Sequence, residues 1–224
     1  MTKYKIKTSL ITRFENVVCK IRFAVFPTEK RLMDILVSII ALILLSPLLL
    51  AVAILIKLES KGPALFKQER IGLYGEPFTI FKFRSMRCDA EANRDDLETQ
   101  NESASGVIFK MKRDPRVTYV GRIIRKTSID ELPQLLNVIR GDMSLVGPRP
   151  PLPSEVAKYS RSDRARLLVL PGITCLWQVA GRSEIPFDKQ VKLDVRYIER
   201  QSIGLDLLVL LKTIPAVLKA RGAY

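Results

Sequence analysis

A single apolar run constrains this chain more than any other feature of its sequence. The run extends over Ile35–Ile56 and is interrupted only by Ser38 and by the pair Ser46 and Pro47. A run of about 20 apolar residues is long enough to enter a bilayer, and it lacks the polar face of a buried soluble helix. We therefore expect a membrane-embedded helix, bent at Pro47 because proline removes a backbone donor and pushes against the carbonyl of Ile43.

Basic residues flank this run on both sides, with Lys30 and Arg31 before it and Lys57 and Lys61 after it. Positive charge accumulates at the cytoplasmic end of membrane helices, so both ends are expected in the cytoplasm. Split at Pro47, the halves are about 18 and 14 Å long at 1.5 Å per residue. Each matches roughly one leaflet of a hydrocarbon core of about 30 Å. The pattern favours a re-entrant helix-break-helix over residues 31–58, and a spanning helix with a mild kink is the alternative.

The overall charge and the absence of histidine limit the chemistry. The 224 residues carry a formal net charge of +14, which suits anionic lipid surfaces, polyphosphate substrates or nucleic acid. No histidine is present, which excludes imidazole bases and histidine-ligated metals. A metal cofactor would be a hard cation held by oxygen, such as Mg²⁺. The three cysteines, Cys19, Cys88 and Cys175, are too far apart for a zinc pattern or a disulfide framework.

The remaining pattern predicts an α+β, mainly helical fold in three parts. Residues 1–30 form a basic leader, either a surface helix or a tail, and residues 59–224 form a cytosolic catalytic domain without a cleaved signal peptide before it. Strands are expected at 64–68 and 78–83, an extended segment at 173–179, and helices at 120–125, 130–139, 162–168 and 187–199. Ser128 and Glu131 have the spacing of a capping box. The apolar segment 205–219 is either an interfacial amphipathic helix or part of the core.

Two acidic clusters are candidates for catalysis. In the first, Arg84 precedes Asp89 and Glu91. A carboxylate can attack phosphorus when nearby cations and a metal reduce its repulsion from phosphate. In the second, a basic helix precedes Asp130 and Glu131. Read alone, each cluster also fits an ordinary solvated helix.

Two further clusters are candidates for phosphate and nucleotide binding. Arg149 lies between two prolines in the segment 147–151, which holds its guanidinium on a stiff backbone suited to phosphate oxygens. Downstream, Gln178 and Arg182 follow the turn at Pro171–Gly172. An amide, an arginine and the single tryptophan in this segment form a set that can hold a nucleotide.

Together these motifs resemble one family. The apolar run with Ser46-Pro47, the segment FKFRSM, the segment SIDELPQLLNVIRGDMSLVGPRP and the segment PGITCLWQV occur in order over residues 28–224. They are similar to the monotopic phosphoglycosyl transferases of bacteria, which transfer a sugar-1-phosphate to polyprenyl phosphate at the start of exopolysaccharide, capsule or glycan assembly. The resemblance implies that Ser46-Pro47 breaks a re-entrant helix.

The resemblance also implies a reaction. A UDP-sugar loses UMP, and its sugar phosphate passes to an enzyme aspartate and then to a polyprenyl phosphate such as undecaprenyl phosphate. In the family an adjacent Asp-Glu pair is catalytic, with Mg²⁺ as cofactor. The match chosen here is Asp89 as nucleophile and metal ligand, with Glu91 assisting across Ala90.

The resemblance carries expectations for binding and location as well. Substrate and phosphate contacts are expected from these side chains: Arg84, Arg149, Asp130, Glu131, Gln178 and Arg182. The catalytic domain faces the cytoplasm at the bacterial inner membrane, in contact with membrane lipids, and a homodimer is compatible with an interfacial enzyme. The competing interpretations are a membrane-anchored scaffold protein and a nucleic-acid binder, but the chain carries no recognisable motif for reading nucleic acid.

Overall fold

The computed structural model describes residues 28–90, 107–108, 111 and 114–218. The helices longer than seven residues are α2 (Thr28–Glu59), α3 (Tyr119–Lys126), α7 (Phe187–Arg200) and α8 (Ile203–Leu218). The short helices are α4 (Leu135–Arg140), α5 (Pro153–Ala157) and α6 (Leu176–Ala180), with 3₁₀ helices at Leu73–Gly75, Ile129–Gln134, Asp163–Leu168 and Arg182–Glu184. The strands are β1 (Leu65–Ile71), β2 (Pro77–Phe83), β3 (Ser144–Val146) and β4 (Gly172–Thr174). The fold is thus mainly helical with short strands, as the sequence predicts.

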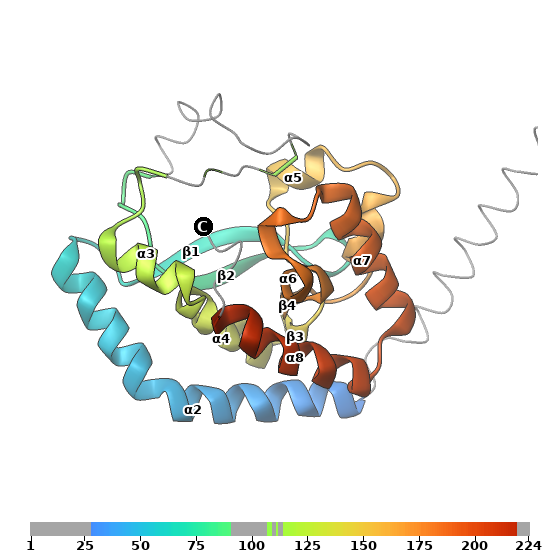
Figure 1. Ribbon diagram of the computed structural model, residues 1–224, viewed down its shortest axis with the longest axis horizontal. Coiled ribbons are helices and arrows are strands. Elements are labelled where there is room, and N and C mark those ends of the chain that lie inside the picture. The colour runs from blue at the N-terminus through green and yellow to red at the C-terminus, as the bar shows by residue number, and fades with distance from the viewer. Residues whose placement is uncertain (1–27, 91–106, 109–110, 112–113, 219–224) are drawn as a thin grey trace, which may run out of the picture.

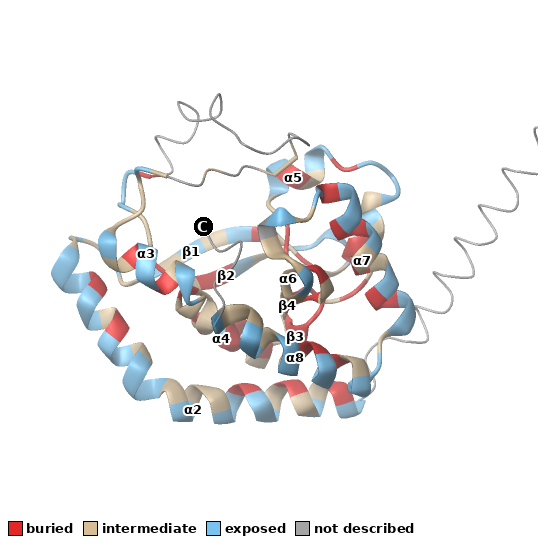
Figure 2. Cartoon of the chain, in the orientation of Figure 1, coloured by how far each residue is buried: buried red, intermediate tan, exposed pale blue. Residues whose placement is uncertain are grey.

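Helix α2 runs along one edge of the molecule and bends near its middle (Figure 1). The Ser46 hydroxyl donates a hydrogen bond to the carbonyl of Ile43, 2.8 Å away, beside Pro47. The most apolar 18-residue window of α2 has a mean hydropathy of 3.1, yet only 11% of that window is buried. A core helix with that hydropathy would be mostly buried, whereas α2 leaves most of its apolar residues exposed (Figure 2). By length and composition, α2 could therefore cross a membrane.

Both ends of α2 are fastened to the rest of the domain. At its start, the buried Lys30 ammonium donates to the Asp206 carboxylate of α8 and to the carbonyl of Val146. Near its end, Val52 and Ile56 are buried in a cluster with Phe83 of β2. The two halves of the bent helix therefore pack against one and the same globular body (Figure 1).

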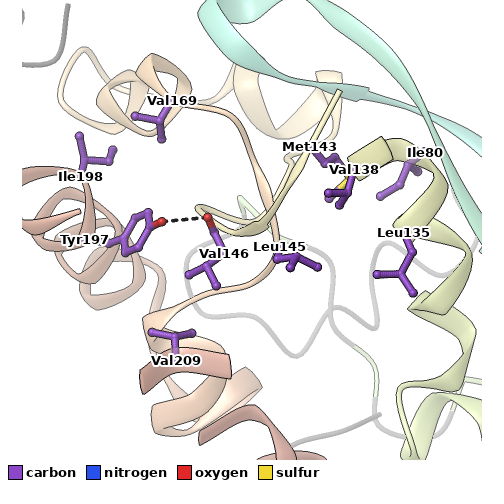
Figure 3. Packing of buried hydrophobic residues seen from close by; sticks show 10 residues of the cluster. All are labelled: Ile80, Leu135, Val138, Met143, Leu145, Val146, Val169, Tyr197, Ile198 and Val209. Carbon is purple, nitrogen blue, oxygen red and sulfur yellow. Dashed lines mark hydrogen bonds between the residues drawn. The ribbon is translucent and has the colours of Figure 1, made fainter. Parts of the chain in front are cut away.

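Among the described residues, the strands form two separate sheets. Strands β1 and β2 form an antiparallel hairpin in which Phe66 pairs with Lys82, and β3 and β4 form a parallel pair. Figure 3 shows the core around β3, where the Tyr197 hydroxyl of α7 donates to the carbonyl of Val146 at 2.9 Å. Apolar side chains from β2, α4, β3, α7 and α8 complete this core.

Two glycines allow the segments around β3 and β4 to cross at close range. The Gly147 amide donates to the carbonyl of Thr174 at 3.0 Å, and the Gly172 amide donates to the carbonyl of Pro148 at 2.8 Å. A Cβ on Gly172 would lie 2.0 Å from the Gly147 nitrogen, which no side chain tolerates. The proline-rich segment 147–151 and the turn at Pro171–Gly172 thus form one structural unit.

Several local predictions differ from the structure. The segment 173–179 is not extended throughout, because β4 ends at Thr174 and α6 begins at Leu176. Ser128 forms no capping box: its side chain makes no cap hydrogen bond, and its backbone has a φ of 57°. Residues 205–218 are helical as part of α8, in which Asp206 and Val209 are buried, as core packing requires, while Leu207, Leu208 and Leu211 are exposed. An interfacial position for this helix stays a prediction. The leader 1–27 lies outside the described residues.

Candidate active site

Asp130 and Glu131 lie on the 3₁₀ helix Ile129–Gln134, which leads directly into α4. The Glu131 amide donates to the carbonyl of Ser128, and Pro133 lies inside the 3₁₀ helix. Asp130 is 8% exposed, and the side chain of Glu131 is 29% exposed. One carboxylate is thus shielded from water, and its neighbour is only partly accessible.

Lys82 of β2 forms an ion pair with this site. Its ammonium lies 2.6 Å from the Glu131 carboxylate, as a hydrogen bond and ion pair. Buried Asn137 of α4 fixes the two elements together: its Oδ1 accepts from the Phe81 amide at 3.0 Å, and its Nδ2 donates to the carbonyl of Thr79 at 2.7 Å. Asn137 therefore holds β2 against α4 and, with it, Lys82 against Glu131.

The two carboxyl groups have opposite pKa shifts. Burial raises the pKa of Asp130 to about 6, an effect that the Lys82 ammonium opposes and the Glu131 charge increases. Burial also acts to raise the pKa of Glu131, but the Lys82 ammonium and the guanidinium groups of Arg149 and Arg70 more than offset it, and the net shift is downward. The site therefore keeps Glu131 ionised and leaves Asp130 the more readily protonated partner.

Arg149 lies on the proline-rich loop near the site, and its role in phosphate binding stays a prediction. The buried Arg70 guanidinium donates to the carbonyl of Pro150 at 3.0 Å and so ties this loop to β1. The Arg149 guanidinium is 3.3 Å from the Glu155 carboxylate of α5 and acts on Glu131 through its charge. A guanidinium on a stiff loop, close enough to act on Glu131 through its charge, suits the planar oxygens of a phosphate.

Arg182 approaches the same carboxylate pair from the segment after α6. Its Nη2 donates to the Ser128 hydroxyl at 3.4 Å, and both residues have positive φ angles, 51° and 57°. Such backbone strain is concentrated at functional sites. Burial lowers the pKa of Arg182, and the Glu131 charge opposes that shift. Gln178, on α6 four residues before Arg182, is half-buried, and its Oε1 has no partner among the described residues.

Other predicted site residues lie elsewhere. Arg84 is buried, and its guanidinium donates to the carbonyls of Ser60 and Lys61 just after α2 and to that of Ile56, so it caps the membrane helix. Asp89 has a 59% exposed side chain and lies 3.8 Å from Arg87. Glu91 lies outside the described residues.

Sequence reasoning missed Lys82 and Asn137 as parts of the site. It also passed over one signal, because Asp130-Glu131 is the one place in the chain where glutamate directly follows aspartate. The assembled group has two carboxylates of unequal pKa surrounded by one ammonium and at least two guanidinium groups. Such a set can bind a diphosphate and present a carboxylate oxygen to phosphorus.

Comparison with known proteins shows which family the chain belongs to. The chain is similar to galactosyl transferase CpsE of Streptococcus agalactiae (48% identity over 195 residues, 87% of this chain and 43% of the relative). It is also similar to exopolysaccharide production protein ExoY of Sinorhizobium fredii (42% over 199 residues, 88% of each chain). A third relative is UDP-glucose:undecaprenyl-phosphate glucose-1-phosphate transferase of Caulobacter vibrioides (43% over 204 residues, 88% of this chain and 72% of the relative).

The chain thus spans less than half of the first of these relatives and most of the other two. Residues 26–220 match the family described as bacterial sugar transferase. The match covers both the membrane helix and every residue of the candidate site. The chain belongs to the bacterial sugar transferase family.

Proposed function

We propose that this protein transfers a sugar-1-phosphate from a UDP-sugar to a polyprenyl phosphate, such as undecaprenyl phosphate, and releases UMP. The name of the Caulobacter relative states this reaction for glucose, and that of CpsE states galactosyl transfer. Because these sugars differ, the proposal covers UDP-sugars as a class. The reaction would be the first membrane step in building an exopolysaccharide, capsule or other glycan at the bacterial inner membrane. The observation that carries the proposal is the Asp130-Glu131 pair, surrounded by cations in a domain fastened to an exposed apolar helix.

Asp130, rather than Asp89, takes the nucleophile's role in this proposal. It belongs to an adjacent Asp-Glu pair, it is shielded from water, and cations converge on its neighbour. Asp89 is largely exposed and beside Arg87. A desolvated carboxylate is a stronger nucleophile than a hydrated one, provided that it is ionised.

The transfer proceeds in two displacements. An Asp130 oxygen attacks the phosphorus that carries the sugar, a new O–P bond forms, and the bond to the UMP oxygen breaks, so that UMP leaves with the electron pair. A lipid phosphate oxygen then attacks the same phosphorus, and the Asp130–phosphorus bond breaks and restores the carboxylate. A covalent intermediate lets one site handle the two substrates in turn.

The surrounding residues bind and orient the phosphates. Arg149 and Arg182 lie on two separate segments, interact electrostatically with Glu131 and would neutralise the diphosphate of the donor. Lys82 holds Glu131 and keeps it ionised. Glu131 in turn positions these cations beside Asp130, so we assign it a positioning role.

Mg²⁺ is part of the proposal as well. Among the described residues no group of three or more His, Cys, Asp or Glu side chains could hold a metal. Two adjacent carboxylates nevertheless fit Mg²⁺, which is commonly held by one or two carboxylates plus substrate phosphates and water. Asp130 and Glu131 would supply these oxygens, and the ion would stabilise charge on the phosphates.

The membrane helix is proposed to be re-entrant. Its two ends are fastened to the same domain, through Lys30 at the start and Ile56 near the end. A helix that crossed the bilayer would place these ends on opposite sides. The bend in α2 and its exposed apolar residues favour a helix that dips into one leaflet and returns (Figure 1).

The decisive experiment measures UMP release from a panel of UDP-sugars by the full chain in detergent, with Mg²⁺ and undecaprenyl phosphate. We expect Asp130→Asn to lower turnover by at least roughly 10³-fold and to abolish covalent labelling by a donor radiolabelled in its sugar. The matched variant Asp89→Asn should retain both.

Two outcomes would contradict the proposal at different points. If Asp89→Asn loses labelling while Asp130→Asn keeps it, the nucleophile is Asp89. If the wild-type chain releases UMP from no UDP-sugar in the presence of Mg²⁺, the transferase assignment fails and a membrane-bound scaffold protein becomes the better interpretation.

A further inference from the structure

An open apolar hollow lies beside the last turns of α2 and has a volume of about 290 Å³. Sites for whole small molecules usually have volumes of about 300–1,000 Å³, so this hollow is large enough for part of a ligand. It is lined by Ala53, Ile54, Lys57, Leu58 and Ala64. Four of the five are apolar, and the only charge among them is the ammonium of Lys57.

The hollow is adjacent to the candidate active site. Ala53 and Ala64 pack against the same buried cluster as Ile129, which directly precedes Asp130. The strand register supports this position: Phe66, two residues beyond Ala64, pairs with Lys82, which binds Glu131. Two residues of strand extend about 7 Å, and the paired strand lies about 5 Å further across. The lining residue Ala64 is therefore close to the backbone of Lys82, on the hairpin that holds the Lys82 ammonium against Glu131.

The other side of the hollow continues into the lipid-facing surface of α2. Ile54 is 50% exposed and Leu58 is 79% exposed. Both lie on the same helix as the exposed apolar residues of the membrane segment. A hydrocarbon chain in the bilayer can reach the hollow along this surface without passing a buried polar layer.

The charge at the mouth of the hollow favours an anion. Lys57 is exposed and has no carboxylate partner among the described residues, and exposed Lys61 follows two residues after the end of α2. The nearest acidic side chain in sequence, Glu59, accepts a hydrogen bond from the Val120 amide of α3 instead. Lysine presents a compact positive charge on a flexible stem, which suits a phosphate that must move toward the reaction centre.

We propose that this hollow is the acceptor subsite, which receives the phosphate end of a polyprenyl phosphate. The phosphate binds Lys57, the first part of the polyprenyl chain packs against Ala53, Ile54, Leu58 and Ala64, and the rest of the chain stays in the bilayer. The inference rests on the proposed function, because the acceptor's chemistry is taken from it. It adds where the acceptor enters and which residues select a phosphate joined to a hydrocarbon chain.

The kinetic test separates the two substrates. With the full chain, Lys57→Gln should raise the apparent KM for undecaprenyl phosphate roughly tenfold, since a hydrogen bond to a charged group is lost. The KM for the UDP-sugar and the single burst of UMP released without acceptor should stay unchanged. Lys192→Gln, at an exposed position on α7, is the matched control and should change neither KM. An unchanged acceptor KM in Lys57→Gln would overturn the proposal.

A second variant fills the hollow itself. Ala53→Phe should weaken acceptor use while retaining the acceptor-free burst of UMP, and Ile40→Phe, at an exposed position elsewhere on α2, should leave both intact. If Ala53→Phe does not fold, the Lys57→Gln result still decides the proposal. Normal acceptor kinetics in folded Ala53→Phe would count against it.

A binding test does not depend on activity. A polyprenyl phosphate that carries a diazirine in its first isoprene units should label residues 53–64 of the wild-type chain. Excess undecaprenyl phosphate should prevent this labelling, but phosphatidylglycerol should not. Labelling at another segment overturns the proposal, and equal competition by phosphatidylglycerol shows a general site for anionic lipids instead. If labelling succeeds but no UMP is released, the acceptor subsite stands and the proposed reaction fails.

Discussion

At the scale of single residues, Asp130 and Glu131 are bonded neighbours in different environments. Asp130 is buried, with a pKa raised to about 6, whereas Glu131 is held ionised by Lys82, Arg149 and Arg70. Because the two groups interact, their protons leave in steps that belong to the pair, and the last step is the one near pH 6. Environments that separate the pKa values of two neighbouring acids are typical of catalytic pairs.

The pH dependence of the reaction should report this last step. Asp130 must be ionised to attack, so kcat/KM for the UDP-sugar should fall about tenfold per pH unit below roughly 6. An ordinary aspartate, with a pKa of about 3.9, would not limit the rate until much lower pH. Profiles from pH 5 to 8 test this, and Lys82→Met should shift the acid limb to higher pH because the ammonium opposes the rise in the Asp130 pKa. A limb that is absent, or that moves to lower pH in Lys82→Met, would contradict the assignment.

At the scale of elements, buried polar contacts hold the membrane helix against the domain. Lys30, Asp34 and Ser38 are spaced four residues apart and form a buried polar stripe on the first half of α2. Lys30 binds Asp206, and the Asp34 carboxylate accepts from the Leu145 amide. At the other end, Arg84 caps the carbonyls that follow α2. These contacts fix the position of α2 against the domain that carries Asp130 and Glu131.

Breaking the Lys30–Asp206 pair should loosen this junction. Lys30→Met leaves the buried carboxyl groups of Asp206 and Asp34 without their shared cation, and breaking a buried pair typically destabilises a protein by about 3–5 kcal/mol. Thermal unfolding in detergent should show a clear loss for Lys30→Met and a partial recovery in Lys30→Met/Asp206→Asn, where the charge of Asp206 is removed and only the Asp34 carboxyl still lacks its cation. Glu29→Gln, next in the chain and exposed, should change stability by less than about 0.5 kcal/mol. Equal stability of Lys30→Met and Glu29→Gln would show that the pair does not secure the helix.

At the scale of the whole molecule, several helices carry exposed large apolar side chains among the described residues. They occur along α2, on α8 at Leu207, Leu211 and Leu218, and on α3 at Tyr119 and Ile123. Together with the net charge of +14, they suit a domain that rests on an anionic membrane surface. A homodimer stays a prediction.

The re-entrant arrangement can be tested by labelling cysteines in intact cells. In a chain whose own cysteines are replaced by serine, Glu29→Cys and Lys61→Cys place thiols at exposed positions before and after the apolar run. A membrane-impermeant maleimide should reach both only after the inner membrane is opened. Ile43→Cys, 66% exposed but within the apolar run, should remain unlabelled throughout. Labelling of one end in intact cells and not of the other would establish a spanning helix.

The sequence by itself determined the features that depend on neighbouring residues. The apolar run predicted α2, strand-forming segments at 64–68 and 78–83 predicted strands where β1 and β2 lie, and helical periodicity predicted α7, because each pattern depends on nearby residues. Only the tertiary structure decided that Arg84 caps a helix while Lys82 faces Glu131, although both cations belong to the same short motif. It also separated buried Asp130 from exposed Asp89. Burial and charge at these side chains come from segments far apart in the chain, 49 residues in the case of Lys82 and Glu131, and no local pattern records such contacts.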